Sequence, residues 1–375
     1  MVNMSIILNV SVALIIISIV SGWCMFFRNK KLYLNREVDH LKMLSVIIPA
    51  RNEGRQIGRL LDSINIQTYK KLEVLVVDDG STDNTAEIVR SFGYRVIKNE
   101  LNKGWVGKSS ACWKGANQAN GEYLLFLDAD TELYKPDSLE TIVNHFEEKG
   151  SSGILSIEPY HIVKKWYESF SVVFNIIVVT GMNVFTPIKS KLKPAGAFGP
   201  TIICSKEDYF NSGGHFKYCD SVMDNFGLAK AIEEKGLPIH CYLGKQTIHF
   251  RMYPNGIKQL VEGWTKSFAT ASESTHPLVM TLISMWISGA FVASLLLIIS
   301  PMLSNSNWII ISFILYSIYA VQCYVLARRV GNFPFFPHFL FYPVLFLFFT
   351  IVFIRSLYLT KVKKSVKWKG RDIDV

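Results

Sequence analysis

The sequence predicts an α/β domain with a parallel sheet of the doubly wound type, accompanied by membrane-spanning helices. Short apolar strands alternate with helical patterns between residues 44 and 130. Polar clusters follow three of these strands, which is typical of a ligand site at the carboxyl edge of such a sheet. Long apolar stretches lie outside this region, each near the length that crosses a bilayer: 5–27, 278–303, 308–327 and 335–358.

Each element of the α/β region follows from a local pattern. The apolar run Leu44 to Ile48 is stopped by Pro49, and the next segment carries apolar residues at helical spacing. Ser81, Thr82 and Asp83 are candidate caps for the second helix. The expected strands are 44–48, 73–77, 95–98 and 124–127, and the expected helices are 54–66, 82–92 and 106–120.

Acidic residues follow two of the expected strands. Asp128 and Asp130 stand one residue apart directly after the buried strand Leu124 to Leu127, and Asp78-Asp79 follows an earlier strand. Paired carboxylates at such an edge suit a hard divalent cation shared with a diphosphate. A solvated acidic turn is the alternative for one D-x-D alone, and the second acidic strand end favours the site.

Composition indicates a basic membrane protein. The chain has 375 residues, is 50% hydrophobic and has a net charge of +10. The stretch 1–27 predicts a transmembrane anchor. A signal peptide would have basic residues before its apolar run and a cleavage site after it, but here the basic residues follow the run and no cleavage site is evident. The positive-inside rule then places the central domain in the cytoplasm. The expected regions are an anchor 1–27, a basic linker 28–43, a central α/β domain 44–270, a membrane region 278–358 and a basic tail 359–375.

The last apolar stretch leaves two topologies open. A full span over 335–358 would put the basic tail outside, against the positive-inside rule. Pro334, Pro337 and Pro343 favour a broken or re-entrant segment that returns the tail to the cytoplasm. There, the basic tail with Trp368 would suit an anionic lipid surface, or it is an ordinary solvated tail.

Several function classes are excluded. Six cysteines form no C-x-x-C pair, so neither a zinc site nor a disulfide framework is indicated. A dinucleotide fingerprint is absent after the first strand. Residues 102–109 resemble a P-loop but have Asn102 at its first glycine and no leading strand.

Four motifs together resemble glycosyltransferase family 2 with the GT-A fold: SVIIPARNE, VVDDGSTDNT, GWVGKSSAC and FLDADTEL, in this order. The remaining chain resembles a narrower group, the membrane glycosyltransferases of bacterial C30 carotenoid synthesis. Its segments are PYHIVKKWYESFSVVFN, VVTGMNVF, AFGP, SKEDYFNSGGH and FRMYPNGIKQLVEGWTK.

The resemblance implies roles for named residues. Pro49, Arg51 and Glu53 would hold the nucleotide base and ribose, and Asp79 would accept a hydrogen bond from uracil. Lys108 would meet phosphate charge, or is a surface lysine. Asp128 and Asp130 would bind Mg²⁺ or Mn²⁺ against the diphosphate, which neutralises charge on the departing UDP.

An inverting transfer also needs a group that takes the acceptor's proton. In the family this is a carboxylate that opens a helix after the acceptor loop, commonly within a Glu-Asp pair. Here Asp224 occupies the first place and Asn225 the second, which leaves the base open between Asp224 and Asp220. A capping or solvated role for Asp224 is the alternative.

The acceptor side is less defined. Residues 166–185 predict an interfacial helix or a core helix. Gly213, Gly214 and His215 would form a loop under the donor sugar, and Trp264 lies where processive relatives carry Q-x-x-R-W. That motif is absent, so we expect transfer of a single sugar.

The implied enzyme is a multi-pass cell-membrane transferase that moves glucose from UDP-glucose to the carboxylate of a C30 carotenoid acid, 4,4'-diaponeurosporenoate. A polyprenyl phosphate, a glycerolipid or a hopanoid is the alternative acceptor. A degenerate scaffold would lack Asp79, Asp128 or Asp130, and a transporter would carry charge within 278–303, which has none.

Overall fold

The computed structural model describes residues 2–34, 42–99, 105, 107–219, 224–272, 274–303, 305–363, 365–368 and 371–374. The chain forms two compact units that are interleaved in sequence. Unit 1 comprises Met1–Asn29, Val163–Ala195 and Tyr253–Val375, and unit 2 comprises Lys30–Ile162 and Gly196–Met252. Residues 163–195 and 253–270 therefore belong with the apolar helices, although the sequence grouped them with the central α/β domain.

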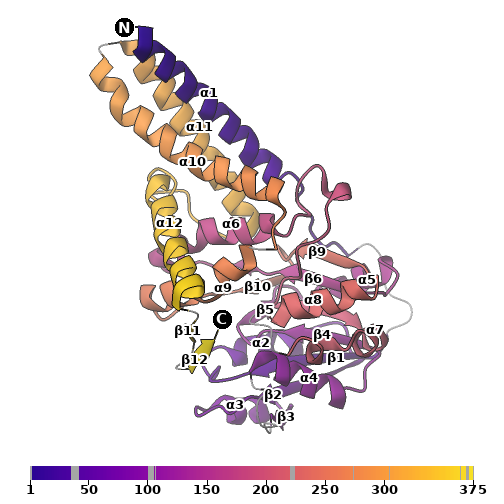
Figure 1. The fold of residues 1–375 in the computed structure, drawn as a ribbon. Coiled ribbons are helices and arrows are strands. Elements are labelled where there is room, and N and C mark those ends of the chain that lie inside the picture. The colour runs from indigo at the N-terminus through magenta and orange to yellow at the C-terminus, as the bar shows by residue number, and fades with distance from the viewer. Residues whose placement is uncertain are drawn as a thin grey trace. The chain divides into compact units, whose positions relative to one another are not determined.

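Unit 2 is built on a seven-stranded sheet with the strand order β3-β2-β1-β4-β8-β6-β9 (Figure 1). A second sheet has the order β5-β10-β7. The strands are β1 Leu44–Ala50, β2 Leu72–Asp78, β3 Arg95–Lys98, β4 Tyr123–Leu127, β5 Thr131–Leu133, β6 Ile154–Glu158, β7 Tyr160–His161, β8 Thr201–Ser205, β9 Ile239–Leu243 and β10 Ile248–Phe250. The helices are α2 Ile57–Asn65, α3 Thr85–Ser91, α4 Lys108–Gln118, α5 Ser138–Glu148, α7 Lys206–Ser212, the 3₁₀ turn η3 Gly214–Phe216 and α8 Asp224–Glu234.

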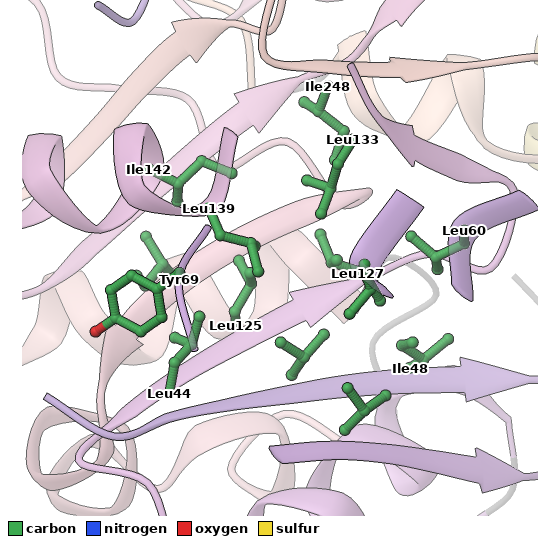
Figure 2. Packing of buried hydrophobic residues seen from close by; sticks show 14 of the residues in the cluster. Leu44, Ile48, Leu60, Tyr69, Leu125, Leu127, Leu133, Leu139, Ile142 and Ile248 are labelled. Atoms are coloured by element: carbon green, nitrogen blue, oxygen red, sulfur yellow. The ribbon is translucent and has the colours of Figure 1, made fainter. Parts of the chain in front are cut away.

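Two apolar clusters cover the two faces of the large sheet. Alternate residues of each strand point to opposite faces, so Leu125 and Leu127 join the cluster formed with α2, α3 and α5. Figure 2 shows this cluster, with Leu60 and Leu139 packed over β4. Leu124 and Phe126 join the second cluster, formed with α4, α7 and α8. The face of a site residue can therefore be assigned from its position along the strand.

The predicted parallel sheet is confirmed for β1 to β4, where β2, β1 and β4 pair in parallel. The sheet as a whole is mixed, because β8 runs antiparallel to both β4 and β6. The second helix begins at Thr85 with Asn84 at its N-cap, so Ser81, Thr82 and Asp83 were wrong as caps. Asp83 instead accepts hydrogen bonds from Thr85 at the helix start. Val106, the expected start of α4, lies outside the described residues.

Unit 1 is mainly helical, and its described residues include four helices that are long and apolar enough to cross a membrane. They cover Ser5–Met25, Pro277–Leu303, Ser306–Val330 and Tyr342–Val362. The described elements are α1 Val2–Met25, η1 Trp166–Ser171, α6 Val172–Gly181, η2 Lys189–Lys191, α9 Ile257–Ser272, α10 Pro277–Ile299, η4 Ser300–Leu303, α11 Ser306–Val330, α12 Tyr342–Tyr358, the π-helical turn η5 Leu359–Lys363, and the hairpin β11 Ser365–Trp368 with β12 Arg371–Asp374.

Helices α1, α10 and α11 lie side by side (Figure 1). A side-chain carbon added to Gly289 would lie 2.1 Å from the Cβ of Ser18, so this glycine permits the close approach of α10 to α1. Gln322 of α11 donates to the carbonyl of Ile19 at 2.6 Å, and Arg329 donates to the carbonyl of Phe26. The carboxyl ends of α1 and α11 therefore lie at the same end of this bundle.

The structure bears on two alternatives that the sequence left open. Phe174 and most other residues of α6 are buried, and α6 packs against α11 and α12, so the core-helix alternative describes this segment. Pro334 and Pro337 lie in the non-helical stretch that precedes α12, and Pro343 lies in its first turn. A proline is tolerated there because that N–H has no helical partner. The side of the membrane on which the tail lies stays a prediction.

Candidate active site

The carboxyl edge of the large sheet brings the predicted site residues of unit 2 together. Asp79 directly follows β2 and Asp128 directly follows β4, two strand positions away in the order β2-β1-β4. Val77 and Phe126 belong to the cluster under α4 and α8. Because strand residues two apart share a face, Asp79 and Asp128 turn toward the face that α4 and α8 cover.

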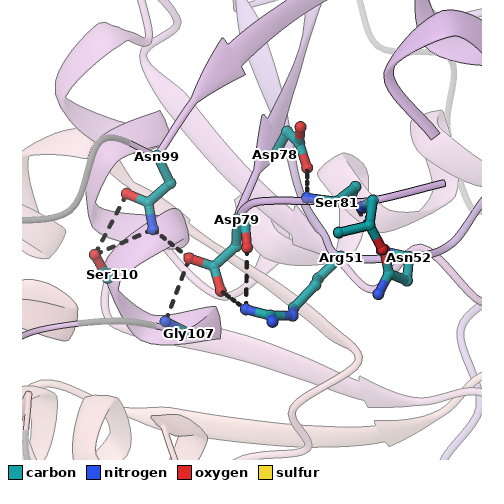
Figure 3. A network of polar contacts seen from close by, with 9 residues as sticks. Arg51, Asn52, Asp78, Asp79, Ser81, Asn99, Gly107 and Ser110 are labelled. Atoms are coloured by element: carbon teal, nitrogen blue, oxygen red, sulfur yellow. Dashed lines mark hydrogen bonds and ion pairs between the residues drawn. The ribbon is translucent and has the colours of Figure 1, made fainter. Parts of the chain in front are cut away.

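A hydrogen-bond network fixes Asp79 (Figure 3). Its carboxylate accepts a hydrogen bond from Asn99 Nδ2 at 2.8 Å and forms an ion pair with Arg51 Nη1 at 3.6 Å. Asn99 is itself held by the hydroxyl of Ser110. Asp79 is 7% exposed, so only a small part of the residue is accessible to a ligand. Sequence reasoning missed Asn99, and its position directly after β3 was the available signal.

The two loops that follow β1 and β2 are tied to each other. Asn52 accepts from the backbone N–H of Thr82 at 2.8 Å, and Glu53 N–H donates to Thr85 Oγ1 at 2.8 Å. Asn52 has a φ of 54°, in the left-handed region that asparagine tolerates better than most residues. Pro49, at the end of β1, lies beside Val77 in the sheet register. Pro49 therefore lies beside β2, Arg51 contacts Asp79, and Glu53 is held by Thr85. Their common role in a nucleotide subsite stays a prediction.

The D-x-D segment forms a tight turn at the end of β4. The carbonyl of Asp128 accepts from both the N–H and the hydroxyl of Thr131, at 3.0 and 2.7 Å. The N–H of Asp128 donates to the carbonyl of Pro200 at 2.9 Å. These bonds fix the backbone on both sides of Asp130, which is partly exposed at the turn. A fixed, accessible carboxylate pair of this kind suits a hard cation.

Lys108 joins the elements of the site. Its ammonium lies 2.7 Å from Asp128 Oδ1 and 3.5 Å from Asp224 Oδ2, and it donates to the carbonyl of Gly199 at 3.1 Å. Burial disfavours the charge of Lys108, but the two carboxylates outweigh it and raise its pKa above the ordinary value. Lys108 is therefore a cation paired with two acidic groups. Its contact with phosphate stays a prediction.

Asp224 and Asn225 have different roles in the structure. Asp224 opens α8, where a carboxylate is favoured by the helix dipole, and its side chain is 22% exposed. Asn225 is buried and donates its amide N–H to the carbonyl of Ala197. A carboxylate at position 225 could not donate this bond, so the departure from the family pattern has a structural reason. Asp220, the alternative base, lies outside the described residues.

The remaining predicted residues do not form one group. Gly214 has a φ of 50°, and a side-chain carbon there would lie 2.6 Å from the ring of Tyr209. His215 is buried beside it, 3.0 Å from the Tyr209 hydroxyl, and burial lowers the pKa of His215 to about 4. Gly213, which precedes Gly214, adopts the left-handed conformation that ends α7. Gly213, Gly214 and His215 therefore form a closely packed turn of unit 2, with His215 buried and uncharged.

Trp264 belongs to unit 1. Its ring stacks on Phe174 at 4.7 Å between ring centroids, and its N–H donates to Ser171 Oγ at 3.0 Å. Trp264 is 7% exposed, so it ties α9 to α6. Its predicted place in a sugar or acceptor loop stays a prediction.

Comparison with known proteins agrees with this geometry. The family model described as "Glycosyl transferase family 2" matches residues 45–192. The 4,4'-diaponeurosporenoate glycosyltransferase of Staphylococcus aureus strain USA300 is 38% identical over 366 residues, which cover 96% of both chains. The chain belongs to glycosyltransferase family 2. The protein of the same name from the bovine strain RF122 is also 38% identical, over 98% of this chain and 97% of its own.

A solved structure shows the same fold. The mannosyltransferase of Pyrobaculum calidifontis in complex with GDP-Man and Mn²⁺ has a TM-score of 0.55 and 18% sequence identity. The likeness covers 95% of this chain and 99% of that one. This family 2 chain is thus a glycosyltransferase with a GT-A-like mixed sheet, and the predicted fold and enzyme class are confirmed.

Proposed function

We propose that the enzyme transfers one glucose from UDP-glucose to the carboxylate of an apolar carotenoid acid, 4,4'-diaponeurosporenoate, at the membrane. The observation that carries the proposal is the cluster Asp128, Lys108 and Asp224. The N–H of Gly107, next to Lys108, donates to Asp79 in the proposed nucleotide subsite. The acceptor is supported by the names of the Staphylococcus relatives, with which identity extends over nearly the whole chain.

The residues of the site fit a divalent cation that is shared with the donor. Among the described residues, no group of three or more His, Cys, Asp and Glu side chains could hold a metal ion alone. Asp130 and Asp128 would supply carboxylate ligands, and diphosphate oxygens would complete the shell of Mg²⁺ or Mn²⁺. Such a cation stabilises the charge of the leaving UDP. The Pyrobaculum enzyme, whose structure contains Mn²⁺ with GDP-Man, is consistent with this assignment.

The chain's own residues would then act as follows. Arg51, Asp79 and Asn99 orient the nucleotide, and Lys108 places positive charge beside the diphosphate. The acceptor carboxylate oxygen attacks the anomeric carbon from the face opposite UDP. The bond between that carbon and the diphosphate oxygen breaks, and its electrons leave with UDP. The product is a glycosyl ester with inverted configuration.

A carboxylate acceptor suits the altered base motif. A lipid carboxylic acid has a reference pKa of about 4 and is ionised at neutral pH, so it needs no base to attack. Asn225 lacks the negative charge that the family's second carboxylate would bring near this acceptor. The enzyme therefore needs charge neutralisation and orientation more than proton removal.

The proposal is tested with membranes that contain the enzyme and a panel of UDP-sugars and lipid acceptors. We expect mass spectrometry to show one hexose added to the carotenoid acid, and mild alkali to release it as an ester would. A product only on hydroxyl lipids, or one that resists mild alkali, would refute the carboxylate acceptor and favour a hopanoid or glycerolipid.

Asp224→Asn should reduce kcat only modestly, by less than roughly 10²-fold, the lower bound for a required general base. The variant keeps the size of the side chain, and Lys108 keeps its ion pair with Asp128. Initial rates at saturating donor and acceptor, with circular dichroism as the folding control, provide the measurement. Complete loss of activity in the folded variant would make Asp224 a required base or acceptor clamp.

The catalytic unit should lie in the cytoplasm. Arg28 follows α1, and Arg328 and Arg329 end α11, so positive charge gathers at one end of the bundle. Protease added to intact spheroplasts should leave the segment 44–162 uncut, while the same protease should cut it in lysed cells. Cleavage in intact spheroplasts would reverse the orientation.

A further inference from the structure

A third acidic side chain lies at the edge that carries Asp79 and Asp128. Glu158 is the last residue of β6, and Ile154 of the same strand belongs to the cluster under α4 and α8. Residues two and four apart on a strand share a face. Glu158 therefore points to the same face as Asp128, Lys108 and Asp224.

Strand register fixes where Glu158 lies along this edge. In the antiparallel pair of β6 and β8, Ser156 lies opposite Ile202, where the paired register ends. Continuing that register by two residues places Glu158 across from Pro200. The carbonyl of Pro200 accepts the N–H of Asp128. Strands lie about 4.8 Å apart, so the two backbone positions are separated by roughly 10 Å. Along the edge, Asp79 after β2 belongs to the proposed nucleotide subsite, and Asp128 after β4 to the proposed diphosphate subsite. Glu158 on β6 comes next, beyond the diphosphate.

The surroundings of Glu158 keep its carboxyl group neutral. The residue is 8% exposed, and among the described residues none donates a hydrogen bond or offers a cation to its side chain. Lys108, the cation that contacts Asp128, is shared by Asp128 and Asp224. The thiol of Cys241 on β9 lies close enough to interact electrostatically with Glu158, and Lys30 acts on the same thiol. Burial, with Asp128 adding to it, raises the pKa of Glu158 to about 8.

We propose that Glu158 binds the acceptor's carboxylate, donating a hydrogen bond from its protonated carboxyl group to the oxygen that does not attack the sugar. This inference rests on the proposed function. A neutral acid is the side chain that can hold a carboxylate in an edge already crowded with negative charge. A hydrogen bond from Glu158 to one oxygen would leave the attacking oxygen without a hydrogen bond and therefore nucleophilic. Lys108 and the bound cation would neutralise the charge of the diphosphate.

The test compares Glu158→Ala and Glu158→Gln in the full-length enzyme, with UDP-glucose and the carotenoid acid as substrates. Loss of one hydrogen bond to a charged group should raise the acceptor KM of the alanine variant roughly 10- to 100-fold. Glutamine keeps a neutral donor of the same length, so its acceptor KM should stay within about threefold of wild type. The donor KM and UDP affinity of both variants should match wild type, which also shows that they are folded.

Asp79→Asn is the matched comparison, because it should raise the donor KM and leave the acceptor KM unchanged. The inference is overturned if Glu158→Ala raises the donor KM instead, which would place Glu158 on the sugar. It is also overturned if Glu158→Gln loses as much as alanine, which would mean that the charge is required. An alkali-stable product from wild-type enzyme would refute the proposed function. An ester product with an unchanged acceptor KM in Glu158→Ala would refute only the role of Glu158.

Discussion

Replacing Asp130 with alanine should reduce kcat/KM by at least about 10³-fold. Asp130 would supply a carboxylate ligand to the cation that bridges enzyme and diphosphate, and a bound metal contributes several kcal/mol of charge stabilisation in the transition state. The turn that holds Asp130 is fixed by the bonds of Thr131 and Pro200 to Asp128, so the loss of one side chain leaves the backbone in place. Excess EDTA should inactivate the wild-type enzyme to a similar extent.

Glu132→Ala is the control for Asp130→Ala. It removes the same charge two residues along the chain, from an exposed position on β5. Its activity should match wild type. Calorimetric titration with UDP provides a second readout. Mn²⁺ should tighten UDP binding to wild-type enzyme and have little effect on the alanine variant. Full activity of that variant, or of the wild type in excess EDTA, would rule out metal-dependent transfer.

The half of the sheet that we propose binds the donor could be predicted from local pattern. Each strand from β1 to β4 is a short apolar run, and the chain leaves the core where polar residues begin. Parallel strands joined by helices place their carboxyl ends at one edge, so Asp79 and Asp128 could be expected to lie together. To predict the ion pair between Lys108 and Asp128, one must also expect the third helix to begin at this edge of the sheet.

The second half of the site depends on contacts between distant residues. The antiparallel direction of β8 is set by its pairing with β4 and β6, which no local pattern in TIICS indicates. Glu158 ends an ordinary buried strand and belongs to no recognised motif, so only strand register assigns it to the edge. Asn225 looked like a missing carboxylate, and its role became clear only from the carbonyl of Ala197.

In unit 1, the spacing of apolar residues predicted helices but not what those helices pack against. The pattern around Phe174 suits both a membrane surface and a protein core, because both environments accept the same side chains. Only the packing of α6 against α11 and α12 distinguishes them. Trp264 was assigned from its position relative to processive relatives, and the structure shows it stacked on Phe174 within unit 1.

Replacing Lys108 with methionine should lower kcat by roughly 10²- to 10³-fold, the cost of removing one preorganised group that stabilises transition-state charge. The donor KM should rise as well. Lys108 lies between Asp128 and Asp224, and without it two carboxylates would face the incoming diphosphate with no protein cation between them. Lys114→Met, six residues along the same helix, is the control and should leave both constants near wild type.

A double variant separates the two effects of losing Lys108. If repulsion from Asp224 contributes to the rise in donor KM, adding Asp224→Asn to Lys108→Met should restore part of the UDP affinity. Asp224→Asn alone should leave that affinity nearly unchanged, so the two substitutions should be non-additive, as expected for groups in direct contact. Strict additivity in UDP binding would show that Asp224 does not face the diphosphate. A kcat within tenfold of wild type in Lys108→Met would show that the bound cation alone neutralises the leaving group, and that the ion pairs of Lys108 serve only to hold α4 and α8 against the sheet.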